Sequence, residues 1–491
     1  MNTTSATHLF QSDTSLAVGR ARAEKAARTA HGELYGHPIW LGSRGAPLQQ
    51  TETVHAQETP VDTTQLAELA AGADGGKAKA ITAHKCSITD PVLWTAESGH
   101  IARGISLESG LTLQQLRGHT GPVSALASVV LAHGRTLLFT GSWDKSIRIW
   151  AVGERGARRP APLVILRDAA ADFIKALHAD AEHACLLSGA SDKAVRIWDL
   201  RLLIQWASDK APEEWAEVLS REKDAPVGCP VPTLAGVCRE HLRPVVCITT
   251  LPPCPDAGFR SDAFYAFSAD SMGRVLQSAI VFDDAAERSA HAAVLRELNG
   301  PETGVLDMVA TWRVYGPEED QWGADIWVSS SDESVRRFPL SEGAREKFVP
   351  GRVSHAGAQV GTAAPLMADA LLSIPASASA ILPLGVSDGE KDALITGDVQ
   401  GELEVWCMEP VHKFAAHEGH WHEITHLDRW LRAEDKTLWI VSTSLDGTVR
   451  RWPLPRLLTT EAQRDTETRP AAVGVALTAE EEAELTELMD D

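Results

Sequence analysis

Five histidines lie close together near the C-terminal end of the sequence, in the stretch HKFAAHEGHWHEITH from His412 to His426. Imidazole nitrogens bind zinc, and histidines two positions apart lie on one face of a strand, so His420 and His422 could share a metal ion. Protein zinc sites use at least three ligands from the chain, and neither a cysteine nor a pair of acids accompanies these histidines. We therefore expect surface and turn histidines here and no metal site.

A second group of reactive side chains occurs in TGSWDKSIRIW, residues 140–150, where a serine and an aspartate precede a tryptophan. Ser and Asp take part in catalysis, but an active site normally occurs once in a chain. Here the pattern recurs in SGASDKAVRIW (188–198), FSADSMGRVL (267–276), SSSDESVRRF (329–338), ITGDVQGELEVW (395–406) and STSLDGTVRRW (442–452), and in degenerate form in VLWTAESGHIARGI (92–105). We therefore interpret these residues as structural. No Walker loop, GxSxG, HExxH or GxGxxG motif occurs in the sequence, which favours a protein that is not an enzyme and has no cofactor.

The elements that must position these residues are strands. Each segment reads as a short apolar strand, a turn with Asp and a second strand that usually ends in Trp. A Gly-His pair or a variant of it precedes several segments, and histidine, hydroxyl, carboxylate and indole can form one hydrogen-bonded chain that holds the turn. The predicted members are His119, Ser142, Asp144 and Trp150 in the second repeat, Asp192 and Trp198 in the third, and His417, Asp446 and Trp452 in the last.

With these repeats the chain resembles the WD-repeat family of β-propellers over about residues 77–455. The resemblance is closest in the second and third repeats and weaker in the fourth and fifth, where Leu276 and Phe338 stand in place of Trp. It implies an all-β fold in which four-stranded blades, seven of them here, surround a central channel.

Three regions of the chain are predicted: a largely disordered N-terminal arm (1–76), the propeller (77–455) and an acidic C-terminal tail with a short helix (456–491). Only PLPRLL follows the last Trp before the polar tail, so the last blade lacks an outer strand of its own. We expect KAKAITA, residues 77–83, to supply this strand and to cover the exposed sheet edge.

Insertions are expected on one face of the propeller, opposite the Gly-His turns. They lie between third and fourth strands (Leu202–Pro232, Leu276–Glu297 and Pro339–Ala368) or between first and second strands (Leu251–Asp262 and Val314–Asp325). Within the first of them, APEEWAEVLSREK predicts a short helix with Pro212 at its start. The other face, here called the mouth face, carries the Gly-His turns and the turns with Asp and has short loops.

Charge and cysteine content limit the classes of partner and compartment. The 46 Lys and Arg against 67 Asp and Glu give a net charge of −21, which argues against nucleic acid. No run of about 18 apolar residues occurs, so no membrane span is expected. Seven cysteines without a CxxC pair favour an intracellular compartment, the nucleus or the cytoplasm. The basic, Ala-rich stretch 19–32 leaves a mitochondrial presequence as a less favoured alternative.

We expect the chain to be a non-catalytic scaffold or adaptor of an intracellular multiprotein complex, with a partner's peptide or helix on the mouth face. Aromatic and Arg side chains dominate binding hot spots, and those that adjoin the turn Asp or follow the His should point to this face. The candidates for partner binding are Trp143, Phe173, Arg243, Trp421 and Leu445. The alternative for the two tryptophans is that they pack on neighbouring blades. A second contact is expected through the acidic tail, residues 478–489.

An alternative function is suggested by Trp198-Asp199-x-Arg201. This segment resembles the box with which substrate receptors dock on the adaptor of cullin–RING ubiquitin ligases. The resemblance implies that Asp199 and Arg201 would be the docking residues. The motif is short, occurs once and overlaps an ordinary repeat, so its specificity is low.

Overall fold

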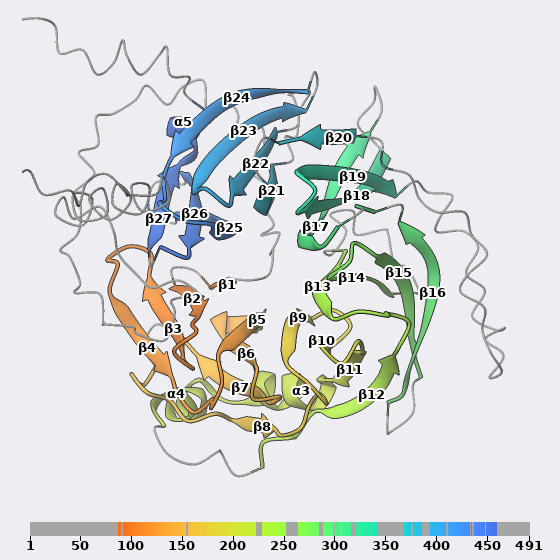
Figure 1. Cartoon of the computed structure of the whole chain (residues 1–491). Coiled ribbons are helices and arrows are strands. Elements are labelled where there is room, and N and C mark those ends of the chain that lie inside the picture. The colour runs from red at the N-terminus through yellow and green to blue at the C-terminus, as the bar shows by residue number, and fades with distance from the viewer. Residues whose placement is uncertain are drawn as a thin grey trace, which may run out of the picture.

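The computed structural model is a ring of seven antiparallel sheets around a central channel (Figure 1). It describes residues 87–458 apart from 90–91, 154–155, 222–227, 252–263, 284–287, 299, 302, 316–320, 341–367, 369, 375–376, 385–392, 409–410, 433, 435–436 and 447. The seven-bladed all-β propeller predicted from the repeats is confirmed.

The blades follow one another in chain order, and each begins with the strand nearest the channel (Figure 1). Blade 1 contains β1 (Ser87–Thr89), β2 (Val92–Ala96), β3 (Ala102–Ser106) and β4 (Thr112–Leu116). Blade 2 contains β5 (Val123–Val130), β6 (Thr136–Ser142), β7 (Ile147–Val152) and β8 (Val164–Leu166). Blade 3 contains β9 (Ile174–Asp180), β10 (Cys185–Ala190), β11 (Val195–Asp199) and β12 (Thr233–Cys238).

The remaining blades follow the same order. Blade 4 contains β13 (Val245–Thr250), β14 (Phe264–Asp270), β15 (Val275–Phe282) and β16 (Ala290–Leu298). Blade 5 contains β17 (Val305–Tyr315), β18 (Gln321–Ser330), β19 (Ser334–Leu340) and β20 (Ala370–Ser373). Blade 6 contains β21 (Ala378–Leu384), β22 (Ala393–Asp398), β23 (Glu402–Met408) and β24 (Val411–Glu418). Blade 7 contains β25 (Ile424–Leu431), β26 (Leu438–Ser444) and β27 (Val449–Pro453).

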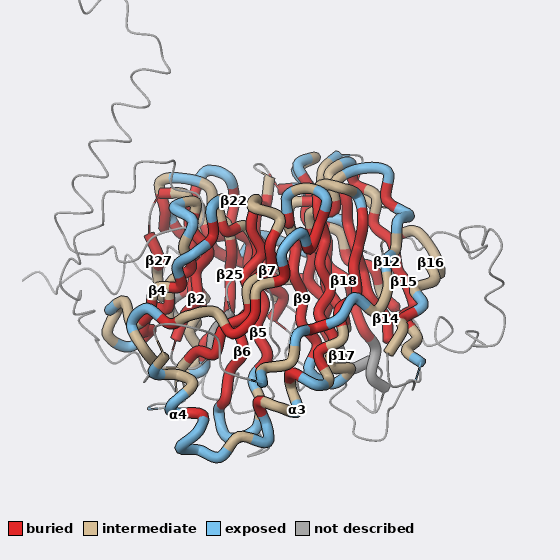
Figure 2. The backbone as a smooth tube through the Cα atoms, turned by 90° about the horizontal axis from the view of Figure 1, so that it is seen from below, coloured by how far each residue is buried: buried red, intermediate tan, exposed pale blue. Residues whose placement is uncertain are grey.

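Adjacent blades pack closely because the second strand carries a glycine where the first strand of the next blade approaches. A Cβ on Gly141 would lie only 2.7 Å from Cγ2 of Ile174. The same approach recurs for Gly189 with Val245 and for Gly397 with Ile424. Both faces of the central strands are therefore covered, and Figure 2 shows them as an almost continuous buried layer. This packing explains the small residue in the repeated TGS, SGA and TGD segments.

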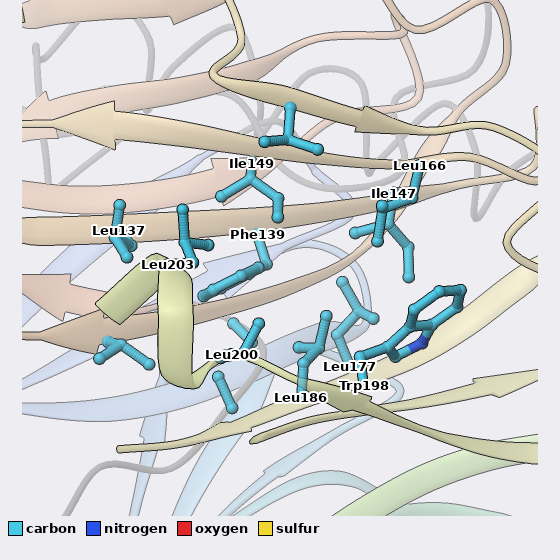
Figure 3. Close-up of a cluster of buried hydrophobic side chains, with 14 of the residues drawn as sticks. Leu137, Phe139, Ile147, Ile149, Leu166, Leu177, Leu186, Trp198, Leu200 and Leu203 are labelled. Atoms are coloured by element: carbon cyan, nitrogen blue, oxygen red, sulfur yellow. The ribbon is translucent and has the colours of Figure 1, made fainter. Parts of the chain in front are cut away.

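The insertion after β11 forms two helices, α3 (Arg201–Asp209) and α4 (Pro212–Ser220), and α4 matches the predicted helix. Figure 2 shows both helices projecting beyond the strands on one face of the ring. Leu203 of α3 and Trp215 of α4 belong to the same buried cluster as Phe139 of blade 2, and Figure 3 shows Leu203 beside the strands. The insertion thus extends the apolar core between blades 2 and 3.

Two other insertions, each described in part, were predicted as loops, and this was wrong in part. Much of Leu276–Glu297 belongs to β15 and β16, and much of Val314–Asp325 belongs to β17 and β18. The strands continue into both stretches, where β15 pairs with β16 and β17 pairs with β18. Most of Leu251–Asp262 and Pro339–Ala368 lies outside the described residues.

Blade 7 has three strands among the described residues, as the sequence predicted. The segment expected to complete it, 77–83, lies outside the described residues, as do the arm 1–76 and residues 459–491 of the tail. After β27 the chain forms the short helix α5 (Leu454–Leu457), and the side chain of Leu457 is fully buried in the core of blades 6 and 7.

Arg135, just before β6, secures the α3–α4 insertion to blade 2. Its side chain is buried, and its guanidinium donates hydrogen bonds to the carbonyls of Ala207 (2.8 Å), Ser208 (2.6 Å) and Lys210. The last carbonyls of a helix have no partner within the helix, and a cation there also complements the helix dipole. The guanidinium lies 5.9 Å from the ring centroid of Trp215, so it contacts both helices.

The substitution Arg135→Met should lower the free energy of unfolding by about 2–4 kcal/mol, because it leaves the buried carbonyls at the end of α3 without a donor. Urea unfolding followed by tryptophan fluorescence measures this change. Arg159→Met is the matched control, since Arg159 is exposed. A loss of less than about 0.5 kcal/mol for Arg135→Met would contradict the anchoring role.

Candidate functional site

The turn with Asp in blade 2 is held by one continuous chain of hydrogen bonds. The indole Nε1 of Trp150 donates to Oγ1 of Thr140 (3.0 Å), which is 2.8 Å from Nε2 of His119. Nδ1 of His119 is 2.8 Å from Oδ2 of Asp144. An indole only donates and a carboxylate only accepts, so a neutral His119 with its proton on Nδ1 satisfies every link.

The charges in this chain follow from its surroundings. Burial lowers the pKa of His119, which keeps the ring neutral. Burial alone would raise the pKa of Asp144, but the hydrogen bonds from His119 and Ser146 hold it well below its usual value. The carboxylate also accepts the backbone N–H of Thr120 (3.0 Å), so it connects the turn to the loop from blade 1.

The structure corrects one predicted member of this chain. Ser142 was expected to supply the hydroxyl, but Thr140 does, and Ser142 instead donates to the carbonyl of Gly121 (3.0 Å). In four blades an indole donates to a hydroxyl that stands ten residues before the tryptophan: Thr140–Trp150, Ser188–Trp198, Thr396–Trp406 and Ser442–Trp452. Strand pairing across the turn sets this spacing, and it was the signal that the sequence interpretation missed.

A second correction concerns blade 7. His417 was expected to be its histidine, but His420 takes that place, with Nε2 2.7 Å from Oγ of Ser442 and Nδ1 3.1 Å from Asp446. His417 lies at the end of β24, where it pairs with Leu403 across the sheet, and its Nε2 is 2.8 Å from the carbonyl oxygen of Leu457. His420 stands 22 residues before its hydroxyl partner, close to the 21 of His119, whereas His241 of blade 4 stands 27 before Ser268.

Blades 3 and 4 keep only part of the chain. In blade 3, Nε1 of Trp198 donates to Ser188, and Arg196 and the backbone N–H of Ala171 bind the carboxylate of Asp192 in place of a histidine. In blade 4, His241 is 2.7 Å from Oγ of Ser268 and 3.4 Å from Asp270, with no tryptophan.

Each held turn places two side chains of the mouth face next to each other. The residue before the turn Asp, or its equivalent, donates its backbone N–H to the loop that enters the same blade. These bonds are Trp143 to Pro122 (3.0 Å), Ser191 to Phe173 (2.8 Å), Ser271 to Pro244 (3.0 Å), Ser331 to Gly304 (3.1 Å), Val399 to Ser377 (3.2 Å) and Leu445 to Glu423 (2.9 Å). The backbone is thus the same in six blades, while the side chains at these positions differ.

Between blades 2 and 3 these positions hold two aromatic rings. Trp143 and Phe173 stack with ring centroids 5.0 Å apart and planes inclined by 14°. Trp143 is half-buried, and 39% of Phe173 is exposed. The predicted packing of Trp143 on the neighbouring blade is therefore present, and partner binding by this partly exposed pair of rings stays a prediction.

The other three candidates for partner binding divide between two blades. Arg243 is exposed on the loop into blade 4, next to Leu242, of which 71% is exposed. Trp421 and Leu445 are half-buried together at blade 7, where the backbone N–H of Trp421 donates to Asp446 (3.1 Å). Trp143, Phe173 and Arg243 thus share one sector of the mouth face, and Trp421 and Leu445 lie outside it.

The residues of the alternative docking box contact each other. Nε of Arg201 donates to Asp199 (3.0 Å), and Arg288 from blade 4 lies 3.4 Å from the same carboxylate. The guanidinium of Arg201 remains partly exposed at the start of α3. The docking role of Asp199 and Arg201 stays a prediction.

The predicted histidine pair does not converge on a metal. His420 is buried in the turn chain, whereas His422 is exposed and its Nδ1 accepts the backbone N–H of Glu423 (2.9 Å). Within the described ranges, no group of three or more His, Cys, Asp or Glu side chains has the arrangement of a metal site. No helix that the structure describes has the length and apolarity needed to span a membrane.

The geometry defines the class of the protein as a seven-bladed propeller with a complete Trp–hydroxyl–His–Asp chain in blades 2 and 7. The model of the WD domain, G-beta repeat, family matches residues 110–151 and 162–199, which contain the last strand of blade 1, the strands of blade 2 and the first three strands of blade 3. The matched segments are WD repeats, and the ring as a whole has the fold of a WD-repeat propeller.

Several known proteins have similar sequences. An uncharacterized WD repeat-containing protein of Schizosaccharomyces pombe is 24% identical over 403 residues, which cover 82% of this chain and 85% of that protein. The periodic tryptophan protein 2 homolog of S. pombe is 34% identical over 98 residues, covering 20% of this chain and 10% of that protein. Kinesin-like protein KIF21A of Homo sapiens is 31% identical over 139 residues, covering 27% of this chain and 8% of that protein.

Thr140 should contribute more to stability than its counterpart in the incomplete chain of blade 3. Thr140→Val removes the hydrogen bonds that Thr140 makes with Nε1 of Trp150 and Nε2 of His119, and should lower the free energy of unfolding by about 2–4 kcal/mol. Ser188→Ala, the matched control, leaves only the indole of Trp198 without its hydrogen-bond partner. It should lower the free energy of unfolding by about 1–2 kcal/mol. Denaturant unfolding of the two variants tests the difference, and equal losses would contradict the role of His119.

His178, on the inner strand β9, gives a pH dependence to stability. It is fully buried beside Thr250 (Nε2 to Oγ1, 2.6 Å), and burial lowers its pKa to about 4. Between pH 6.5 and 4 the unfolded chain binds a proton at this histidine that the folded chain does not. The free energy of unfolding should therefore fall as the pH falls through this range. Urea unfolding at several pH values should show a shallower fall for His178→Gln, and an unchanged slope would contradict this origin.

Proposed function

We propose that the chain is a non-catalytic scaffold or adaptor of a cytoplasmic or nuclear multiprotein complex, and that its mouth face binds a partner protein at the Trp143–Phe173 stack. WD-repeat propellers generally bind other proteins, which supports the general class. The acidic tail, residues 478–489, is proposed as a second contact.

The aromatic stack is the observation that carries the proposal. The hydrogen-bonded turn needs only its hydroxyl, His, Asp and Trp side chains, and the equivalent positions in other blades hold Ser, Pro, Gly, Val, Leu or Glu. The turn therefore does not require a ring at either position. A partly exposed pair of rings on a rigid frame matches the composition of binding hot spots.

Substitution of Trp143 or Phe173 by Ala should weaken partner binding by about 1–4 kcal/mol with little change in Tm, since both rings lie outside the buried core. The tagged chain is purified with its partners, which are identified by mass spectrometry, and the affinity of a recovered partner is then measured for each variant. Val399→Ala is the matched control, because Val399 occupies the same turn position in blade 6 and 40% of it is exposed. Unchanged binding by both ring variants would exclude the stack as the partner site.

A further inference from the structure

Lys and Arg are concentrated in the mouth-face loops of three consecutive blades. The loops and turns of blades 2–4 on this face (117–122, 143–146, 167–173, 191–194, 239–244 and 271–274) contain five acids and seven cations: Arg117, Lys145, Arg167, Lys193, Arg239, Arg243 and Arg274. Mouth-face segments of the other blades (97–101, 299–304, 331–334, 374–377, 398–402, 418–423 and 445–448) contain no Lys or Arg and nine acids. Arg103 and Arg336 reach this face from strands of blades 1 and 5, but they pair with Glu97 and Asp332. This segregation occurs in a chain with a net charge of −21.

Most of these cations have no acidic partner within the propeller. Arg274 pairs with Glu297 (3.0 Å). Among the described residues the other six make no ion pair, and five of them, all except the half-buried Lys145, are exposed. Two of the acids in the same sector, Asp144 and Asp192, already accept several hydrogen bonds within their turns. The sector therefore presents more available positive than negative charge.

The cations surround the aromatic stack. Lys145 lies in the same turn as Trp143, and Arg167 begins the loop that ends at Phe173. Lys193 lies in the turn that donates its backbone N–H to the carbonyl of Phe173. Burial lowers the pKa of the Arg148 guanidinium, and the charge of Arg167 from the next blade lowers it further, so positive charges approach each other across the junction of blades 2 and 3.

Resting on the proposed function, we infer that blades 2–4 form a site for an acidic peptide segment with an aromatic or large aliphatic side chain. The apolar side chain covers the Trp143–Phe173 stack, and Asp or Glu side chains on either side of it pair with Arg167, Lys193 and Arg243. The three blades are adjacent in the ring, so the segment can run along one arc of the mouth face (Figure 1). The acidic loops of the remaining blades repel the segment and limit it to this arc.

An extended nucleic acid fits this surface less well. It would continue beyond the basic arc onto loops that carry only acids. The two rings also stack on each other at 5.0 Å, which leaves no space for a base between them.

The test uses fluorescein-labelled synthetic peptides and the full chain. The acidic peptide GEDEEFEDEEG should bind at low salt, its Phe→Ala version about tenfold more weakly, and the basic peptide GKRKKFKRKKG not measurably. Affinity for the acidic peptide should fall when NaCl is raised from about 50 to about 200 mM, because the ion pairs are exposed. Fluorescence anisotropy gives the Kd in each case.

Charge reversal then locates the site. Arg167→Glu and Arg243→Glu should each raise the Kd of the acidic peptide by about tenfold, whereas Arg159→Glu, an exposed arginine outside the mouth-face loops, should leave it unchanged. Equal Kd values for the three variants, or tighter binding of the basic peptide or of a single-stranded oligo-dT, would overturn the inference. Loss of a cellular partner with Phe173→Ala but no binding of the acidic peptide would leave the proposed function standing and reject the acidic partner. Peptide binding that depends on Arg167, together with partner recovery that does not depend on Phe173, would support the site and reject the proposed function.

Discussion

The hydrogen-bonded chain from indole to hydroxyl to imidazole to carboxylate determines how the mouth face of this propeller is built. In blade 2 the indole, hydroxyl and imidazole are buried and the carboxylate is half-buried, and a buried polar group without a partner destabilises the fold, so the chain is stable only when the turn has one conformation. In blade 2 it joins the third strand at Trp150, the second strand at Thr140, the entering loop at His119 and the turn at Asp144. The hydrogen-bonded side chains beneath the turn therefore determine where its exposed side chains lie.

The same backbone recurs in successive blades. Side chains that recur with it have a structural role, whereas side chains that differ between blades are candidates for a binding site. The hydroxyl and the tryptophan recur with constant spacing, which accounts for them structurally. Trp143 and Phe173 occupy positions where the backbone bonds are the same in other blades and the side chains are not. The incomplete chain of blade 3, where Arg196 binds Asp192, shows that a blade can lose its histidine and keep its turn.

The sequence predicted the number of blades and the position of the insertion with α3 and α4, since repeat period and apolar alternation are local properties. It misplaced Ser142 and His417 because a residue type near the expected position was preferred to the spacing that strand pairing imposes. Thr140 and His420 follow from that spacing once one blade is known. Arg135 could not be predicted, because its partners lie more than 70 residues away and become neighbours only when the helices fold back onto blade 2.

The contrast between the basic arc of blades 2–4 and the acidic remainder of the protein gives selectivity for a ligand. At physiological ionic strength the Debye length is about 8 Å, so a ligand at blades 2–4 interacts mainly with the charges of that arc and much less with the net charge of −21. During approach the acidic remainder disfavours anions everywhere except over the arc, which orients a ligand of mixed apolar and acidic character before contact. The aromatic stack then supplies apolar contact at the place where the field is attractive. Charge pattern and ring position are thus two independent features of the same three blades, and neither is required by the turns that present them.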